Sequence, residues 1–455
     1  MDYDVDILVI GAGACGLAAA IAAHDAGLSS AVLEKLDRPG GNSSLSTGSV
    51  PGAGSRFQRE AGIVDNPQTM VRDLTAIASE TDDIDLVRRL AEVSAPTVEW
   101  LVDTVGARLQ LVTAYKHIGH SVPRLHAPIS RRGQDLVDDL LAAVEKRAIP
   151  LALGNSVREL IVEDGAVVGA RVAVGQTEET IRARKIILAV NGFAGNAKLV
   201  RRFCPEIAGA QYFGARGSTG EAVIWGEKLG AALANMAAYQ GYAAVADPHG
   251  SLLSWTTIEK GGILVGADGH RFGNESLGYS GYARIVLEQG ARAFAIFDQT
   301  IFDVAAQEEE FVELADYGGL KSAPTAAAAA EAYGLDAKTV DEEVAAYNAS
   351  ARGEKPDRFG RRDFGLAPLK GPFYACRVVP GLFHTQGGVR VDRDGRVLRK
   401  DLTPIPNLFA GGGAAEGISG RAGALGYASG NGLLSAIALG RLAALAAAAE
   451  IKQAA

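Results

Sequence analysis

The N-terminal segment, residues 6–35, changes its hydrophobic pattern twice. The short β-branched run DILVI is followed by the longer apolar run ACGLAAAIAAHDAG and then by a second short run, SAVLEK. Apolar runs in the order short, long, short predict a strand, a helix and a second strand. The segment therefore predicts the βαβ unit of a parallel sheet.

Residues 67–141 are predicted to be helical, and residues 149–196 are predicted to be rich in β-strands. Residues 67–141 have helical spacing, with one apolar face in the stretch 84–102. Residues 149–174 alternate as β-strands joined by a turn at Asp164-Gly165, and residues 183–196 return to a buried strand and a glycine turn. Another helix is expected after residue 218, with Ser218 or Thr219 as its cap.

Residues 236–355 differ from the preceding part of the chain in their sequence pattern. Two strand-like runs, GGILVGADG and AFAIFD, are followed by Ala-rich acidic helices, and the charged stretch RGEKPDRFGRRD ends the region. We expect a second domain inserted into the first, which then divides into residues 1–235 and 356–455. Strand-like runs near 373–391 and 405–410 resume the first domain.

Composition narrows the class of protein. The chain has 455 residues and a formal net charge of -8, so no basic field exists to hold nucleic acid. Its three cysteines are far apart and show no CxxC spacing, which argues against a disulfide framework or a zinc site and fits a reducing cytoplasm. The Ala-rich run 433–449 falls short of the roughly 20 apolar residues of a membrane span, and a packed C-terminal helix is expected.

A glycine motif follows the first predicted strand. Gly11, Gly13 and Gly16 give GxGxxG, in which the glycines allow a tight turn, a close approach to a pyrophosphate and close helix packing. Glu34, at the end of the second strand, is placed to accept a hydrogen bond from a ribose hydroxyl, and its charge disfavours a 2′-phosphate. NAD or FAD then remains. The second glycine- and hydroxyl-rich loop, residues 38–49, favours FAD, which extends further past the pyrophosphate than an NAD half-site needs.

The order of these motifs resembles a known family. GAGACGLAAA, GGNSSLSTG, LAVNGFAGN, GHRFGNES, HTQGGVRVD, IPNLFAGGG and GNGLLSAIALGR occur in the order seen in FAD-dependent enzymes that include the fumarate reductase flavoprotein and the 3-ketosteroid Δ1-dehydrogenases. The resemblance implies an α/β fold, in which a Rossmann-like FAD-binding domain of the glutathione-reductase type carries an inserted α+β substrate-capping domain.

The resemblance also implies the cofactor site. It predicts non-covalent FAD, because residues 40–48 contain no histidine for a covalent link. The implied cofactor-binding residues are Gly11, Gly13, Ala14, Cys15, Gly16, Glu34, Lys35, Gly41, Asn42, Ser43, Ser46, Thr47, Gly48, Val157, Asn191, Gly192, Gly412, Gly413, Asn431 and Leu433.

Two positions separate the branches of the family. Fumarate reductases have an arginine proton donor five residues after the Asn of RFxNE, which is Tyr279 here, and a substrate-binding arginine four residues before the Asn of GGN, which is Tyr427 here. Tyrosine is neutral at physiological pH, since a phenol ordinarily has a pKa of about 10, whereas arginine is always charged and binds carboxylates with two parallel hydrogen bonds. The ketosteroid dehydrogenases, by resemblance, have tyrosine at both positions.

The resemblance thus implies α,β-desaturation of a cyclic ketone. Tyr427 and a backbone N–H of Gly430 or Asn431 would bind the carbonyl oxygen, and Tyr279 would take the α proton. Tyr115 is the candidate to assist this base, and His384 and Gly387 are candidates to contact the substrate. Arg124, His126 and Arg421 are interpreted as solvated charges, although each is also a possible contact to a substrate carboxylate.

Several alternatives stay open. The ring is a cyclohexanone type such as 4-oxocyclohexanecarboxylate or a 3-ketosteroid, and the reverse activity, reduction of an unsaturated acid or enone, is the second interpretation. A flavin-binding module without turnover is a third. The electron acceptor is oxygen, a quinone or a carrier protein, since the chain has no CxxCH haem motif and no iron–sulfur cysteine set. No metal, nucleic acid or integral membrane segment is expected.

Overall fold

The computed structural model describes residues 3–78, 83–113 and 117–454, which divide into two compact units. The first unit contains residues 1–205, 214–239 and 384–455, and the second contains 206–213 and 240–383. The inserted unit therefore extends 28 residues past the expected end at 355. The reason is that the charged stretch near 355 forms ion pairs with Arg271 and Glu275 of this unit. In addition, the long strand β16 (Phe373–Thr385) lies at the middle of the unit's sheet.

The first unit is built on the expected parallel sheet. Its central strand β1 (Val5–Ile10) pairs in parallel with β2 (Ser30–Leu33) and with β9 (Thr177–Leu188), and β9 pairs in parallel with β19 (Pro404–Ala410). The short strands β6 (Leu151–Ala152) and β18 (Arg396–Leu398) complete the sheet at its edges. The mixed α/β, Rossmann-like fold with an inserted unit is thus confirmed.

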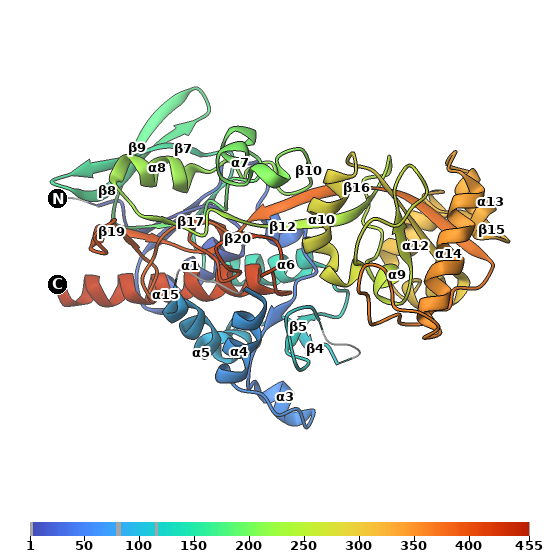
Figure 1. Cartoon of the computed structure of the whole chain (residues 1–455). Helices are drawn as coiled ribbons and strands as arrows, with labels where there is room; N and C mark the ends of the chain where they lie inside the picture. The colour runs from blue at the N-terminus through green and yellow to red at the C-terminus, as the bar shows by residue number, and fades with distance from the viewer. Residues whose placement is uncertain (1–2, 79–82, 114–116, 455) are drawn as a thin grey trace. The chain divides into compact units, whose positions relative to one another are not determined.

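Helix α1 (Ala14–Asp25) packs along α15 (Asn431–Ala454), and Figure 1 shows the two side by side. The contact is close because a Cβ on Gly440 would lie 2.3 Å from the Cys15 carbonyl oxygen. By length and composition α15 is able to cross a membrane, which the sequence did not lead us to expect. However, 67% of its most apolar 18-residue window is buried within the molecule, as a packed core helix would be.

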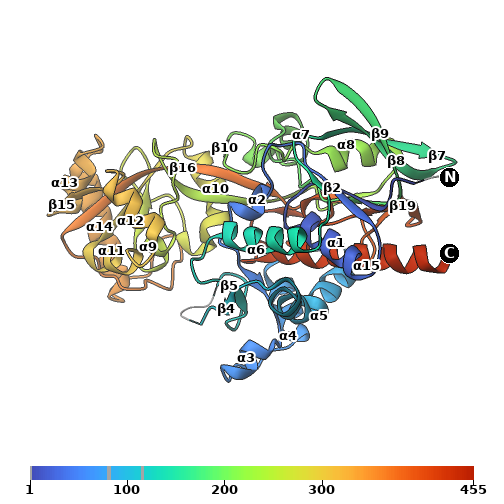
Figure 2. The same cartoon turned by 180° about the vertical axis from the view of Figure 1, so that it is seen from behind.

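The helices of residues 67–141 are interrupted by strands. Helices α4 (Pro67–Ala78), α5 (Ile84–Trp100) and α6 (Gly133–Lys146) form as expected, and Figure 2 shows α6 beside α1. Between them lie β4 (Leu109–Leu111) and β5 (Leu125–Pro128), which pair with β3 (Val50–Pro51). The prediction that residues 67–141 are helical throughout was therefore wrong for β4 and β5, because pairing with the distant strand β3 overrides local periodicity.

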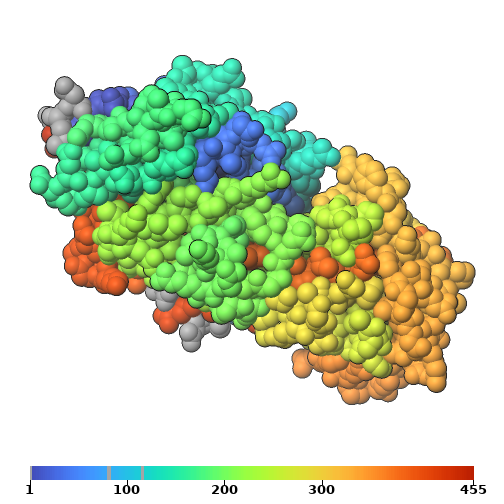
Figure 3. Space-filling model, turned by 90° about the horizontal axis from the view of Figure 1, so that it is seen from above, coloured from blue at the N-terminus to red at the C-terminus, as the bar shows by residue number. Residues whose placement is uncertain are grey.

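The remaining elements of the first unit follow the sequence closely, with one exception. Strands β7 (Ser156–Glu163) and β8 (Ala166–Val174) form a hairpin whose turn has positive φ at Asp164 and Gly165. Figure 3 shows this region, turquoise to green, on the surface of the unit. Helix α8 (Glu221–Leu229) is preceded by Gly220, without a side-chain cap, so the expected cap at Ser218 or Thr219 is wrong.

The second unit is an α+β unit. Strand β14 (Ala293–Asp298) pairs antiparallel with β16 and with β13 (Ile263–Val265), and β15 (Lys321–Ala323) also pairs with β16. The helices of this unit are α9 (Thr256–Glu259), α10 (Gly278–Glu288), α11 (Gln299–Ala305), α12 (Glu309–Asp316), α13 (Ala326–Glu331) and α14 (Ala337–Ala351). Its aromatic core includes Phe294, Phe297, Phe311 and Tyr347.

Candidate active site

The first glycine loop joins β1 to α1. Gly11 has φ +109°, and a Cβ there would lie 2.3 Å from the Ala189 carbonyl oxygen; a Cβ on Gly16 would lie 1.8 Å from the Gly11 carbonyl oxygen. Gly13 is different, because its nearest neighbour would be the Gly40 carbonyl oxygen at 3.6 Å. Two glycines are thus required by packing, and the middle one leaves the helix N-terminus open to a phosphate.

The second glycine loop lies against the first. The Ala14 N–H donates to Ser43 Oγ at 3.2 Å, the Ser46 hydroxyl donates to the Ser43 carbonyl at 2.7 Å, and the Gly48 N–H donates to Ser46 Oγ at 3.1 Å. The hydroxyl groups of Thr47 and Ser49 form a hydrogen bond of 2.9 Å. The serines predicted to bind cofactor therefore also fold the loop around the start of α1.

Glu34 and Lys35 lie at the end of β2. The Glu34 carboxylate accepts the N–H groups of Ala12 and Leu36, each at 2.9 Å. A carboxylate has room for about four hydrogen bonds, so Glu34 is still able to accept from a ribose. The Lys35 ammonium donates to Thr219 at 2.7 Å and pairs with Glu221 at 2.5 Å, which fixes the side chain.

A third group of predicted residues meets at the ends of β9 and β19. Asn191, with φ 63°, donates to Ser218 at 2.7 Å and accepts the Gly192 N–H at 2.9 Å. A Cβ on Gly413 would lie 2.4 Å from Asn191 Oδ1, and one on Gly412 3.3 Å from Cys15 Cβ. These contacts gather the loops at the carboxyl ends of parallel strands, where this type of sheet binds ligands.

The other predicted cofactor residues have mainly structural surroundings. Asn42 Oδ1 accepts the Ala215 N–H at 2.6 Å. Val157 pairs with Val172 in the β7–β8 hairpin, and the side chains of Cys15 and Leu433 are buried in the core. Gly41 has φ 52° and open space beside it.

The turn before α15 holds Tyr427 and the predicted carbonyl-binding amides. Gly430 has φ +82°, and a Cβ there would lie 2.9 Å from the Ser49 carbonyl oxygen. The Asn431 N–H already donates to the Ala428 carbonyl at 3.2 Å. Of the two amides, the Gly430 N–H is thus the better candidate for an external oxygen.

His384 borders this turn. Its ring is edge-on to the Tyr427 ring, with centroids 6.0 Å apart, and burial lowers its pKa to about 4. A neutral imidazole at physiological pH is able to hydrogen-bond a carbonyl but provides no charge for a carboxylate. Gly387 is buried against Met236, since a Cβ there would lie 2.4 Å from Met236 Cα.

A buried polar network that the sequence did not reveal supports the same turn. Arg124 is fully buried and forms ion pairs with Asp65 and Asp73, each at 2.8 Å, so its interpretation as a solvated charge was wrong. Arg124 Nη1 also donates to His120 Nδ1 at 3.0 Å. Arginine has no acceptor, so the His120 proton is on Nε2, which donates to the Ser429 carbonyl at 2.8 Å.

His126, the neighbouring candidate, is also buried rather than solvated. Its Nε2 lies 2.9 Å from Ser55 Oγ, and its ring packs edge-on against Phe57. No signal in the sequence distinguishes Arg124 and His126 from surface residues, because their partners are 51 to 71 residues away.

Tyr279 lies in the second unit, on α10. Its ring contacts the Tyr242 ring, with centroids 5.2 Å apart, and Tyr242 stacks on Phe383 with centroids 5.4 Å apart at 1°. The Tyr242 hydroxyl donates to the Leu253 carbonyl at 3.0 Å and accepts the Trp255 N–H at 3.1 Å. Burial raises the pKa of Tyr242 well above its usual value, so it serves as an aromatic support and not as a base.

The segment that precedes Tyr279 is anchored by buried ion pairs. Arg271 binds Glu275 at 2.7 Å and Asp357 at 2.6 Å, and all three side chains are at most 3% exposed. Arg361 donates to the Gly262 and Ile258 carbonyls. The charged stretch RGEKPDRFGRRD, which was expected to end the inserted domain, thus forms buried ion pairs with Arg271 and Glu275 of RFGNES. Tyr115, the candidate assistant to the base, lies outside the described residues.

The residues of the first unit fit FAD. The open face at Gly13, the acid at the end of β2 and the adjacent hydroxyl loop match a dinucleotide. In addition, Asn431 Oδ1, at the start of α15, is buried without a hydrogen-bond partner among the described residues. The described ranges contain no cluster of three His, Cys, Asp or Glu side chains able to hold a metal ion.

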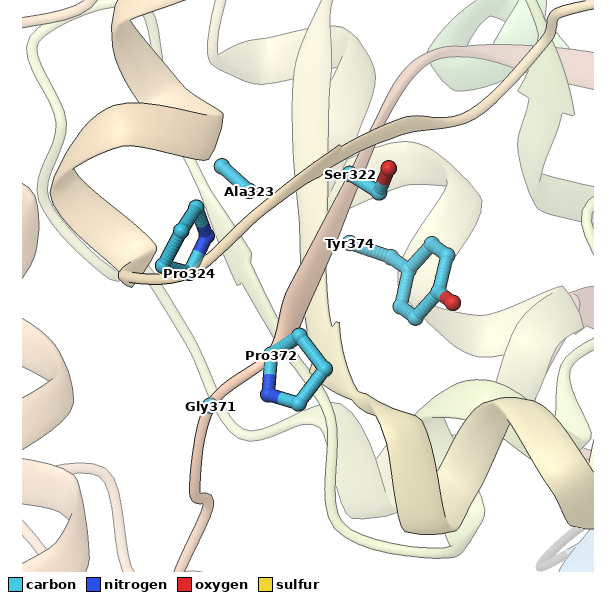
Figure 4. Close-up of a pocket in the computed structure, with 6 residues that line it drawn as sticks. All are labelled: Ser322, Ala323, Pro324, Gly371, Pro372 and Tyr374. Atoms are coloured by element: carbon cyan, nitrogen blue, oxygen red, sulfur yellow. The ribbon is translucent and has the colours of Figure 1, made fainter.

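A separate hollow in the second unit carries none of this chemistry. It is lined by Ser322, Ala323, Pro324, Gly371, Pro372 and Tyr374, as Figure 4 shows. The Tyr374 hydroxyl already donates to Gln299 at 2.6 Å. The hollow contains no residue predicted to bind substrate or cofactor.

The fold and the glycine loops together define a dinucleotide-binding flavoprotein. Residues 6–433 match the family described as FAD binding domain, and the chain belongs to this family and has FAD as its cofactor. It is an FAD-dependent oxidoreductase of that family.

The relatives in this family include two branches. The chain is 32% identical over 420 residues to the NADH:fumarate oxidoreductase of Klebsiella pneumoniae (strain 342). The aligned region covers 91% of this chain but only 45% of that protein. A solved open conformation of a flavocytochrome c3 fumarate reductase matches with TM-score 0.84 and 29% identity, covering 98% of this chain and 78% of that one. The 3-ketosteroid-Δ4-(5α)-dehydrogenase of Rhodococcus jostii RHA1 matches with TM-score 0.77 and 27% identity, covering 98% and 97%.

Proposed function

We propose that the protein desaturates a cyclic ketone next to its carbonyl group, using non-covalently bound FAD. The observation that carries this proposal is the pair of tyrosines at Tyr279 and Tyr427, where fumarate reductases, by resemblance, have arginines. Without these cations a dicarboxylate has lost two charged partners, whereas phenolic hydroxyls suit a carbonyl oxygen and an α proton.

The residues have separate roles in the proposal. The Tyr427 hydroxyl and the Gly430 N–H donate hydrogen bonds to the ketone oxygen and stabilise the negative charge that develops there, an effect that is typically worth about 3 to 4 kcal/mol per donor. Tyr279 is the base that takes the α proton. FAD supplies the acceptor for the hydride that leaves the β carbon, so that a carbon–carbon double bond forms.

The substrate class is a cyclohexanone-type ring such as 4-oxocyclohexanecarboxylate, with a 3-ketosteroid as the larger alternative. The Rhodococcus relative, named for a ketosteroid substrate, supports a ring ketone. The electron acceptor is oxygen, a quinone or a carrier protein. Three buried free cysteines are consistent with a reducing, cytoplasmic location.

A second candidate is the reverse reaction, reduction of the double bond of an unsaturated acid or enone. It is supported by the names of the sequence relatives, which include a urocanate reductase of Eggerthella lenta at 31% identity over 423 residues. Because hydride transfer is reversible, Tyr279 would in this direction donate a proton to the α carbon instead of removing one.

The test is anaerobic flavin bleaching by a panel of cyclohexanones and 3-ketosteroids, compared with fumarate reduction by the reduced protein. We expect ketones to bleach the flavin and Tyr279→Phe to slow this step by about 100-fold or more while FAD stays bound. Tyr282→Phe is the matched control, since Tyr282 lies on the same helix, is fully buried and has a hydroxyl without a partner among the described residues. Reduction of fumarate without oxidation of any ketone would overturn the proposal.

A further inference from the structure

Arg131 has the features of an anion-binding residue. It lies in the loop between β5 and α6 and has φ 58°, a left-handed conformation that is strained for a residue other than glycine. Its guanidinium Nε is buried without a hydrogen-bond partner in the described parts of the chain. Residues held in such a conformation concentrate at functional sites, where the surrounding structure maintains the strain.

The partners of Arg131 are neutral. Its Nη2 lies 3.3 Å from Ser49 Oγ and 3.4 Å from His117 Nε2. Burial, together with the Arg131 charge, lowers the pKa of His117 to about 3, so this imidazole is uncharged. Among the described residues no carboxylate forms an ion pair with Arg131. A partly buried guanidinium with only neutral neighbours lacks a counter-charge, which an anionic ligand would provide.

Ser49 connects Arg131 to the proposed carbonyl site. The Ser49 hydroxyl faces Arg131, and its carbonyl oxygen lies against Gly430, where a Cβ would come within 2.9 Å. Ser49 is thus in contact both with the Arg131 guanidinium and with the turn that is proposed to bind the ketone oxygen. This arrangement fits a small molecule that has a ketone at one end and an anion at the other.

We propose that Arg131, with Ser49 and His117, binds the carboxylate of a ring substrate whose ketone is held by Tyr427 and Gly430. This inference rests on the proposed function for the ketone half. The anion site favours a cyclohexanone that has a carboxylate over a neutral ring ketone or a steroid. Only the carboxylated ring provides a negative charge to pair with Arg131.

The first experiment measures binding without turnover, so it does not depend on the proposed reaction. Cyclohexanecarboxylate, which has no ketone, is titrated into the FAD-loaded protein by calorimetry, and its methyl ester is the neutral comparison. We expect the acid to bind and the ester to bind about 10-fold or more weakly. Arg131→Gly should lose this preference and Arg131→Lys should keep part of it, because lysine retains the charge but not the fork.

Arg131→Gly is a favourable variant because glycine adopts positive φ without strain, so its melting temperature should not fall. Arg132→Gln, the exposed neighbour, is the matched control and should bind the acid like the unmodified protein. Equal binding of the acid by the unmodified protein and by Arg131→Gly would overturn the proposal. Loss of FAD absorbance in Arg131→Gly would overturn it as well, because Arg131 would then serve the cofactor.

The second experiment measures turnover. The ratio of kcat/KM for 4-oxocyclohexanecarboxylate to that for its methyl ester should fall about 10-fold or more in Arg131→Gly, mainly through KM. If no ketone is oxidised but the acid still binds through Arg131, the proposed reaction fails and the anion site stands. If ketones are oxidised with the same preference in both proteins, the anion site fails and the reaction stands.

Discussion

His120 connects Arg124 to the Ser429 carbonyl: its Nδ1 accepts from Arg124 at 3.0 Å, and its Nε2 donates to Ser429 at 2.8 Å. Ser429 lies between Tyr427 and Gly430, the two groups assigned to the ketone oxygen. A single tautomer of His120 therefore holds the turn that positions them.

Replacing His120 should change catalysis through this turn. We expect His120→Ala to lower kcat/KM for a ketone by about 10-fold, the effect of losing roughly one hydrogen bond that aligns a donor, with FAD still bound. His120→Gln should restore most of the activity, because its amide is able to donate to Ser429. The measurement is steady-state kinetics together with the melting temperature.

His126→Ala is the control for that experiment, since His126 is also buried and neutral but bonds to Ser55. It should lower the melting temperature without the same change in kcat/KM. Equal kinetic losses in both variants would show that His120 has only a structural role.

Acid should destabilise the fold before the carboxylates titrate. Burial lowers the pKa of His120, His126 and His384 to about 4, from the unfolded value of 6.5. Between these values the unfolded chain binds more protons, so stability is complete above pH 6.5 and is lost as the pH falls toward 4. Each histidine contributes a slope of up to about 1.4 kcal/mol per pH unit, measured by urea unfolding.

The variant His126→Asn tests this assignment, because removing one titrating group should reduce the slope between pH 6.5 and 4. An unchanged slope in His126→Asn would contradict a titration at this residue. The free energy at pH 7.5 serves as the reference for both proteins.

Gly440 is predicted to be essential for helix packing. In Gly440→Ala the new Cβ would lie 2.3 Å from the Cys15 carbonyl oxygen, so α1 or α15 must shift. We expect a loss of about 1 to 3 kcal/mol or more from overpacking and weaker FAD binding, since α1 begins at the first glycine loop. Leu445→Ala, at a side chain on α15 that is 41% exposed, should change little; absorbance of bound FAD and thermal melting report both effects.

Arg271 is predicted to stabilise the second unit. Arg271→Met leaves Glu275 and Asp357 as buried carboxylates without this partner, which typically costs about 3 to 5 kcal/mol. Denaturant unfolding measures the change. Arg352→Gln is the control, because its ion pair with Glu354 is about half exposed and solvent screens it, so its loss should change stability little. Comparable losses of unfolding free energy in the two variants would show that the buried ion pairs of Arg271 do not stabilise the second unit.

The sequence was informative wherever a local pattern has one structural solution. Apolar periodicity and GxGxxG predicted β1, α1 and β2, and the Asp164-Gly165 pair predicted a hairpin turn that the structure confirms. The positions of Tyr279 and Tyr427 are counted along the chain from neighbouring motifs, so they too required no structure, although their roles stay predictions.

Only the tertiary structure identified the internal charges. Arg124 and Arg361 occur in polar stretches that look solvated in sequence, yet both are buried by partners more than 50 residues away. The same holds for Arg131, whose uncharged partners Ser49 and His117 come from other segments of the chain. Periodicity reports which side of an element is apolar, whereas the pairing of charges is decided by chain segments that meet only after folding.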